Sequence, residues 1–290
     1  MRKSTETSSF GVSAREGHNA EKFYQSNLYN GINLVEITDT NVNSISNEII
    51  NNIFQHTAEN MYELPDNSVH LMITSPPYNV TKEYDQNLTL NQYLQLIEKV
   101  MRETYRVLIN GGRACVNIAN VGRKPYIPLS DHIGRIMTDI GFNNRGQIIW
   151  DKAASAGGSC AWGSWQSASN PSLRDVHEYI LVFSKGNLKR TKGKDTIRKE
   201  DFLEWTKSIW KMNTESAKRV KHPAPFPEEL PHRLINLYSF ENDIVLDPFM
   251  GSGTTAVAAL KNKRNFIGYD ISEEYVKIAY ERIDSVGQLL

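Results

Sequence analysis

The sequence predicts an α/β fold in which helices cover both faces of a mostly parallel sheet. Two observations support this prediction. Short apolar runs alternate with helix-like apolar patterns in residues 55–152 and again in 222–290. Two of these runs end in loops of unusual composition, one rich in proline and one rich in glycine. Alternating strands and helices are typical of parallel sheets, because parallel neighbours need a crossover connection.

The first block contains three strand-like and two helix-like segments. Apolar residues recur at helical spacing from Leu90 to Leu108, which predicts a helix there. Asn110-Gly111-Gly112 predicts a turn that stops this helix, and Gly141 closes the next one. The expected strands are 71–74, 114–119 and 147–150, and the second helix is expected at 129–140.

The second block continues the alternation, after a further strand expected at 177–184. Its expected elements are a helix at 228–238, a strand at 244–247, a helix at 254–261, a strand at 266–270 and a helix at 272–284. Ser272 is a good N-cap for the last helix. Glu273 and Glu274 then fall in its first turn, where the helix dipole favours negative charge.

The bulk composition limits the class of protein. The 290 residues carry 33 basic and 33 acidic side chains, so an argument for a nucleic-acid partner has to rest on local charge. Cys115 and Cys160 lack the spacing of metal ligands, and we expect no metal site. The apolar runs are too short to cross a membrane, and residues 1–19 lack the apolar segment of a signal peptide. We therefore expect a soluble protein of the cytoplasm.

A glycine-rich loop follows the expected strand 244–247, with the sequence Asp247-Pro248-Phe249-Met250-Gly251-Ser252-Gly253-Thr254-Thr255. Glycines let the backbone approach a ligand closely, and the helix start near Thr254 presents free N–H groups. A phosphate-binding loop would carry a lysine after its last glycine, and none follows Gly253. Asp270 ends the next strand and suits a ribose diol, whereas Asp247 suits a cationic group. A nucleoside that bears a sulfonium and an amino acid fits both carboxylates; the alternative is a simple tight turn.

The proline-rich loop Ser75-Pro76-Pro77-Tyr78 follows the expected strand 71–74. Its two prolines fix the backbone and remove two N–H donors, so their carbonyls remain as acceptors. Ser75 adds a side-chain oxygen, and Tyr78 adds a planar face for stacking on a base. Acceptors that hold both hydrogens of an exocyclic amino group expose the nitrogen lone pair for in-line attack on a methyl group. The alternative interpretation is a rigid turn between a strand and a loop.

Together, Thr74-Ser75-Pro76-Pro77-Tyr78 and the later glycine-rich loop resemble the amino-group DNA methyltransferases of bacterial and archaeal restriction-modification or epigenetic systems. The catalytic motif comes first, as in the permuted order of the beta class. The resemblance covers residues 55–284 and implies a Rossmann-like methyltransferase fold that uses S-adenosylmethionine. It implies catalytic roles for Ser75, Pro76, Pro77 and Tyr78. The implied cofactor-binding residues are Asp247, Pro248, Phe249, Gly251, Gly253, Thr254, Asp270 and Phe226.

Other segments resemble the same family. Leu64-Pro65-Asp66 resembles the lead-in to the catalytic strand, and Arg106-Val107-Leu108 resembles the turn before the following strand. The segment 222–228 resembles the one before the cofactor strand, which implies that Phe226 lies near bound cofactor. Relatives often carry Gly-Asp shortly before the Leu-Pro pair, where this chain has Gln55-His56-Thr57, so no role is assigned to His56. The family chemistry also implies base flipping, since an amino group inside a duplex is out of reach.

The segment between the two blocks has a different composition. Residues 185–221 contain twelve Lys or Arg and five Asp or Glu, a net charge of +7, with Trp205 and Trp210 interleaved. This charge suits phosphate contact, and the alternative is a solvated surface. Trp162 and Trp165 belong either to the same DNA-reading lobe or to its small core. The resulting division is an N-terminal extension at 1–54, a catalytic half at 55–152, a target-recognition region at 153–221 and a cofactor half at 222–290.

Ser75 decides the expected target. In the family, Ser-Pro-Pro-Tyr is associated more with cytosine N4 and Asp-Pro-Pro-Tyr with adenine N6. The resemblance therefore implies a cytosine-N4 DNA methyltransferase, with adenine N6 as the alternative. Transfer to an RNA base, or an inactive DNA-binding scaffold, are the remaining alternatives. Cytosine-C5 chemistry is disfavoured, because neither Cys115 nor Cys160 follows a proline.

The same resemblance implies the partners. We expect double-stranded DNA as the substrate, a cognate restriction endonuclease as a candidate partner in the same system, and no membrane. The protein is expected to act as a monomer or homodimer near the nucleoid of a bacterial or archaeal cell.

Overall fold

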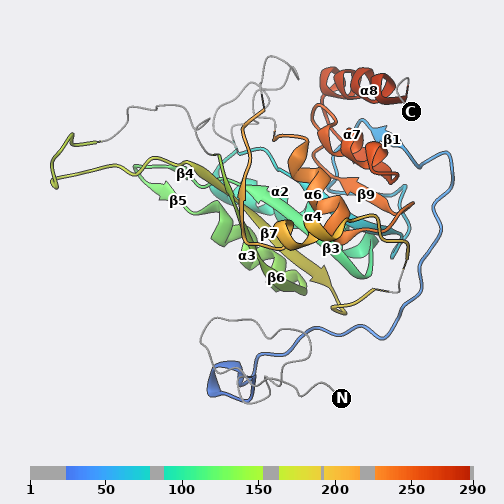
Figure 1. Cartoon of the computed structure of the whole chain (residues 1–290), viewed down its shortest axis with the longest axis horizontal. Helices are drawn as coiled ribbons and strands as arrows, with labels where there is room; N and C mark the ends of the chain where they lie inside the picture. Colours follow the sequence, from blue (N-terminus) through green and yellow to red (C-terminus); the bar gives the residue numbers. More distant parts are fainter. Residues whose placement is uncertain (1–23, 79–87, 153–162, 191–192, 216–225, 288–290) are drawn as a thin grey trace. The chain divides into compact units, whose positions relative to one another are not determined.

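A computed structural model describes residues 24–78, 88–152, 163–190, 193–215 and 226–287 of the chain (Figure 1). The chain divides into two compact units, Met1–Val35 and Glu36–Leu290. In the described part of the first unit, the 3₁₀ helix η1 spans Asn27–Tyr29. The ring of Tyr24 packs edge to face against Tyr29, with 5.1 Å between the ring centroids.

The second unit is built on an eight-stranded sheet with the strand order β1-β10-β9-β2-β3-β7-β6-β8. The strands are β1 (Asn52–Phe54), β2 (Val69–Thr74), β3 (Leu108–Ile118), β6 (Phe142–Asp151), β7 (His177–Lys185), β8 (Ile209–Lys211), β9 (Ile244–Asp247) and β10 (Asn265–Tyr269). The first five strands in this order pair in parallel. β7 runs antiparallel to both β3 and β6, and β8 runs parallel to β6. The prediction of a mostly parallel sheet is confirmed.

Helices cover both faces of this sheet (Figure 1). α2 (Leu90–Val107) and α3 (Leu129–Ile140) pack on one face, together with inward side chains such as Met72. α4 (Lys199–Trp205), α6 (Glu229–Tyr238), α7 (Thr254–Lys261) and α8 (Glu273–Gly287) pack on the other face, which receives Leu71 and Ile73. All three of these β2 side chains are buried, as expected for a strand covered on both faces. The short hairpin of β4 (Val121–Gly122) and β5 (Tyr126–Ile127) forms a separate sheet.

α2 begins at a reciprocal cap and ends without the predicted turn. The Thr89 hydroxyl accepts from the backbone N–H of Gln92, whose side chain accepts from the backbone N–H of Thr89. The helix ends at Val107 and β3 starts at once, so Asn110-Gly111-Gly112 lies inside a strand. The prediction of a turn there was wrong. Gly111 has a φ of +77°, and the irregular pairing of β2 with β3 falls in this stretch.

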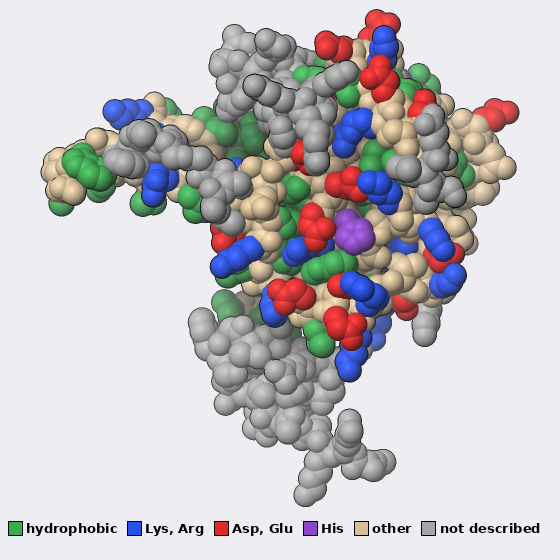
Figure 2. Space-filling model, turned by 45° about the horizontal axis from the view of Figure 1, so that its top comes forward, with side chains coloured by type: hydrophobic (Ala, Val, Ile, Leu, Met, Phe, Trp, Pro, Cys, Tyr) green, Lys and Arg blue, Asp and Glu red, His purple; other side chains and the backbone are tan. Residues whose placement is uncertain are grey.

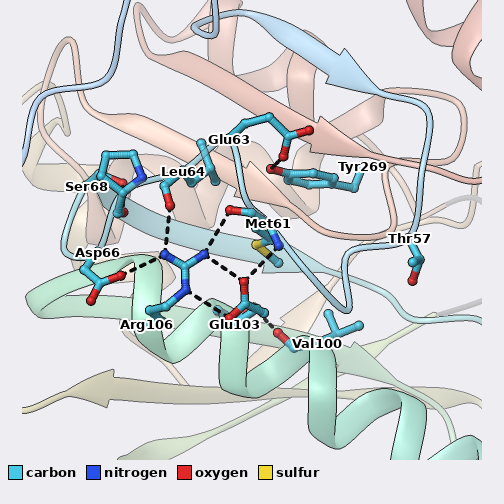
Figure 3. A network of polar contacts seen from close by, with 12 residues as sticks. Thr57, Met61, Glu63, Leu64, Asp66, Ser68, Val100, Glu103, Arg106 and Tyr269 are labelled. Atoms are coloured by element: carbon cyan, nitrogen blue, oxygen red, sulfur yellow. Dashed lines mark hydrogen bonds and ion pairs between the residues drawn. The ribbon is translucent and has the colours of Figure 1, made fainter.

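Arg106 near the end of α2 holds the segment that leads into β2 (Figure 3). Its guanidinium donates to the backbone oxygens of Leu64 and Met61 and to the carboxylates of Asp66 and Glu103, at 2.7 to 2.9 Å. The Glu103 carboxylate also accepts from the N–H of Met61. One cation therefore fixes the loop whose carboxyl-terminal continuation is the catalytic strand.

Three short elements were not predicted from the sequence. β1 lies in the segment that was assigned to the N-terminal extension, yet it pairs in register with β10 at the edge of the sheet. α4 and β8 lie in the segment assigned to target recognition, and β8 pairs with β6. Strands of three residues contain too few positions for an alternation of apolar and polar residues to be recognised.

Candidate active site

The ends of β2, β9 and β10 lie side by side at the carboxyl edge of the sheet. β2 and β9 pair in parallel through Met72 and Leu246, and β9 pairs with β10 through Asp247 and Gly268. The loop Ser75–Tyr78 and the glycine-rich loop therefore leave the sheet next to each other. Ligand sites of open parallel sheets form at this edge.

Asp247 joins the two loops. Its Oδ1 accepts from the Thr74 hydroxyl at 2.7 Å and from the N–H of Phe249 at 3.1 Å, and its Oδ2 accepts from the Thr255 hydroxyl at 2.7 Å. The side chain is buried, and desolvation raises the pKa of the carboxyl to about 6 despite these three hydrogen bonds. Asp247 thus holds the end of β2, the glycine-rich loop and the start of α7 together.

The backbone of the glycine-rich loop depends on two glycines with positive φ. Gly251 has a φ of +51° and Gly253 a φ of +79°. A Cβ atom on Gly253 would lie 2.9 Å from the Cβ of Ala279 in α8. Arg282 of the same helix donates to Ser252 Oγ at 2.9 Å and to Thr254 Oγ1 at 3.1 Å. Packing against α8 and one guanidinium therefore fix the loop.

Asp270 follows β10 and is bonded to both neighbouring turns. Its Oδ2 accepts from the N–H of Gly251 at 2.8 Å, and its Oδ1 accepts from the N–H of Ser272 at 2.9 Å. Burial raises the pKa of this carboxyl above its usual value. A carboxylate offers about four acceptor positions, so each oxygen retains one for a hydroxyl. This set of acceptors fits the ribose diol of a nucleoside cofactor.

The departure from the family pattern at Gln55-His56-Thr57 lies beside Asp270. β1 ends at Phe54, whose carbonyl accepts from the N–H of Asp270 at 3.1 Å. His56 stacks on the exposed ring of Tyr62, with 5.0 Å between centroids, and its Nε2 lies 2.6 Å from Glu63 Oε1. An aromatic pair therefore occupies the position after β1.

In the proline-rich loop, Ser75 and Tyr78 are bonded to each other. The Ser75 and Tyr78 hydroxyls lie 3.2 Å apart, and the Tyr78 hydroxyl donates to Glu178 Oε2 at 2.9 Å. Both side chains are partly exposed, whereas Pro76 is buried. Desolvation and the charge of Glu178 hold the pKa of Tyr78 well above its usual value. Tyr78 is therefore a neutral phenol at physiological pH.

Sequence analysis did not select three residues of this cluster: Asn117, Lys152 and Glu178. Asn117 lies near the end of β3 beside Ser75, and its Nδ2 donates to Glu178 Oε2 at 2.6 Å. Lys152 Nζ lies 2.5 Å from Glu178 Oε1. Glu178 reaches the site because β7 is antiparallel, so that its first residues lie where the parallel strands end. Its polar side chain at the start of an apolar strand was the available signal.

The remaining predicted site residues are distributed around the same edge. Phe249 is partly exposed and packs against the core on the α2 face, and Phe226 packs partly buried against the core on the α6 face. Pro248 is buried and Pro77 is partly exposed. Their assignment to cofactor or substrate stays a prediction.

The basic segment is less available for DNA than its composition indicates. Lys185 is buried and donates to Asn67 Oδ1, and Arg190 pairs with Asp243 at 2.7 Å. Trp205 and Trp210 are buried in the core instead of lying among surface cations. Lys and Arg side chains alternate with Asp and Glu on the face shown in Figure 2.

The tryptophans on the amino-terminal side of this region were left between two roles. Trp165 is 64% exposed, which excludes a role in a small core. Trp162 and Cys160 lie outside the described residues.

Comparison with known proteins agrees with this geometry. Residues 69–281 match the N6/N4 family model described as DNA methylase. The chain is 34% identical over 269 residues to the type II methyltransferase M.MjaI of Methanocaldococcus jannaschii, covering 78% of this chain and 88% of that protein. The chain belongs to the N6/N4 DNA methylase family.

Solved structures of other methylases share the fold. TTHA0409 of Thermus thermophilus, crystallised with S-adenosyl-L-methionine, is 29% identical to this methylase with a TM-score of 0.66, over 80% of this chain and 93% of that one. The cytosine-N4-specific PvuII DNA methyltransferase is 20% identical with a TM-score of 0.65, over 79% and 85% of the two chains, and shows the fold alone. The resemblance seen in the sequence is thus confirmed at the level of family and fold.

Within the described part of the methylase, no helix is long and apolar enough to cross a membrane. The same residues contain no cluster of three or more His, Cys, Asp or Glu side chains arranged to hold a metal ion.

Proposed function

We propose that this methylase transfers a methyl group from S-adenosylmethionine to the N4 amino group of cytosine in duplex DNA, after flipping the base. The observation that carries the proposal is the coupling of Ser75 and Tyr78 to the glycine-rich loop through Thr74 and Asp247. This coupling brings a polar, aromatic loop for a base next to a nucleoside-type loop. When bound, S-adenosylmethionine supplies an electrophilic methyl group.

Asp270 and the glycine-rich loop would hold that cofactor. The spare acceptor positions of Asp270 suit the ribose hydroxyls, and Gly251, Gly253 and Thr254 shape the backbone around it. Asp247 is too well buried and bonded for a direct contact, so its influence on cofactor binding would pass through the loop. Phe249 and Phe226 are proposed to line the pocket, with Pro248 setting the direction of the loop.

On the target side, Ser75 is the residue that favours cytosine. Its hydroxyl accepts one hydrogen of the amino group, while the Pro76 carbonyl offers another acceptor and the Tyr78 ring stacks on the base. Pro77 keeps the loop rigid. Adenine N6 presents the same kind of amino group and is the alternative target.

The region 153–221 is proposed to read the DNA sequence, between a catalytic half at 55–152 and a cofactor half at 222–290. The type II name of M.MjaI supports a restriction-modification setting with a cognate endonuclease.

Nucleoside analysis tests the target base. Unmethylated plasmid DNA is incubated with the protein and S-adenosylmethionine, digested, and measured by mass spectrometry. We expect N4-methylcytosine. Finding only N6-methyladenine would overturn the choice of base, and finding no methylated nucleoside would overturn transfer to DNA. A parallel reaction on structured RNA distinguishes the nucleic acid.

A further inference from the structure

The amide oxygen of Asn117 is a buried acceptor without a hydrogen-bond partner among the described residues. Asn117 is 2% exposed, and its side chain lies in the active-site cluster. Its Nδ2 is 3.4 Å from Ser75 Oγ, 3.4 Å from Tyr78 Oη and 2.6 Å from Glu178 Oε2. A buried acceptor left unpaired costs about 1–3 kcal/mol, so it calls for an explanation.

Glu178 determines which end of the amide is left unpaired. An ionised carboxylate only accepts hydrogen bonds, so it has to face the NH₂ group of Asn117. Lys152 fixes the other carboxylate oxygen at 2.5 Å, and the Tyr78 hydroxyl also donates to Oε2. Rotating the amide by half a turn would place two acceptors against each other. The free atom is therefore Oδ1.

The substrate of amino-group methylation offers what this atom lacks. An exocyclic amino group has two hydrogens, and the Ser75 hydroxyl accepts one of them under the proposed function. We propose that Asn117 Oδ1 accepts a hydrogen bond from the target amino group, in the orientation that Glu178 imposes. Asn117 is then a substrate-binding residue of the transfer step, and Glu178 is a positioning residue that acts through it.

This inference rests on the proposed amino-group transfer and adds no covalent step. Holding the amino hydrogens in two acceptors directs the nitrogen lone pair out of the base plane, toward the methyl donor. An amide suits this position because it accepts without adding a second negative charge beside Glu178. The inference holds for cytosine and for adenine, since both present an NH₂ group.

Single-turnover methyl transfer to unmethylated plasmid DNA tests the proposal. The readouts are the transfer rate, the affinity for S-adenosylmethionine by calorimetry and the thermal unfolding midpoint. We expect Asn117→Ala to lose about 100-fold in rate, the scale of removing one preorganised hydrogen-bonding group, with cofactor affinity retained. Asn143→Ala is the matched control, because Asn143 is a buried asparagine of β6 whose Nδ2 donates to the Gly186 carbonyl. It should lose stability and keep its transfer rate.

An exchange of the two groups distinguishes positioning from packing. Asn117→Asp alone places two carboxylates together and should be slow, and Glu178→Gln alone should also be slow. In the double variant the glutamine amide can donate to the aspartate, which leaves one aspartate oxygen as the acceptor. We expect the double variant to recover to within about 10-fold of wild type, a large coupling for neighbouring sites.

The outcomes separate the two proposals. A wild-type rate for Asn117→Ala, or a double variant no faster than Asn117→Asp, would overturn the role of Asn117 while leaving methyl transfer intact. A rate loss in Asn117→Ala that matches its loss of stability, as in Asn143→Ala, would also overturn it. A wild-type protein that transfers no methyl group to DNA would overturn both proposals.

Discussion

The Thr74 hydroxyl donates a hydrogen bond to Asp247 over 2.7 Å, between two residues 173 positions apart. Thr74 is the last residue of β2, and Asp247 is the last residue of β9. Both are buried. This contact makes the geometry of the proline-rich loop depend on that of the glycine-rich loop, and the two loops therefore respond together to substitutions at either end.

Thr74→Val removes this donor and keeps the shape of the side chain. We expect the free energy of unfolding to fall by about 1–3 kcal/mol, because one acceptor position of a buried carboxylate is left unpaired. The measurement is urea unfolding, combined with S-adenosylmethionine affinity, which should weaken. Thr138→Val is the control, since its hydroxyl bonds only to backbone oxygens of its own helix on an exposed surface. Equal stability of the two variants would contradict the coupling.

Asp247 should make stability depend on pH. Burial raises its pKa from 3.8 to about 6, so the folded chain holds a proton that the unfolded chain has already lost in this interval. Stability therefore falls as pH rises from about 4 to 6, and Asp247 contributes about 3 kcal/mol to that fall. Asp247→Asn should remove this contribution, which urea unfolding across the interval measures. Asp139→Asn, at an exposed helix position, should follow the wild-type profile.

Arg282 should matter for cofactor binding although it lies on α8. It donates to Ser252 Oγ and to Thr254 Oγ1, and so fixes the glycine-rich loop. We expect Arg282→Met to weaken S-adenosylmethionine binding by about tenfold, equivalent to 1.4 kcal/mol. Lys277→Met provides a comparison on an exposed face of the same helix. Calorimetry should show unchanged affinity for that variant, and a tight-binding Arg282→Met protein would refute the role of the arginine.

Arg106 should stabilise the fold more than its neighbour Arg102. Arg106 bonds to two backbone oxygens and two carboxylates (Figure 3). Arg102 pairs only with Glu98 in an exposed i,i+4 contact. We expect Arg106→Met to lose about 2 kcal/mol in urea unfolding and Arg102→Met to lose less than about 0.5 kcal/mol. Similar losses in both variants would show that the network contributes no more than an exposed pair.

The predicted elements were most accurate where a residue with a defined backbone preference ends them. The helix Leu129–Ile140 ends at Gly141 in the left-handed region, as expected, and Ile244–Asp247 and Thr254–Lys261 also have the predicted bounds. The start of β3 was missed because its glycines, typical of turns, lie in an irregular part of the strand. β1 was missed because a strand of three residues gains its stability from pairing with β10, a contact that local periodicity does not record.

The sequence by itself determined the family and placed each of two characteristic loops directly after a buried strand. It also determined which side chains those loops offer, among them Ser75, Tyr78 and Asp270. Only the tertiary structure decided that Thr74 and Asp247 join the loops and that Glu178 orients Asn117 beside them. The physical reason is that strand order, direction and register set these contacts. An apolar strand has the same pattern whichever neighbour it pairs with, so the antiparallel placement of β7, and with it Glu178, had no local signature.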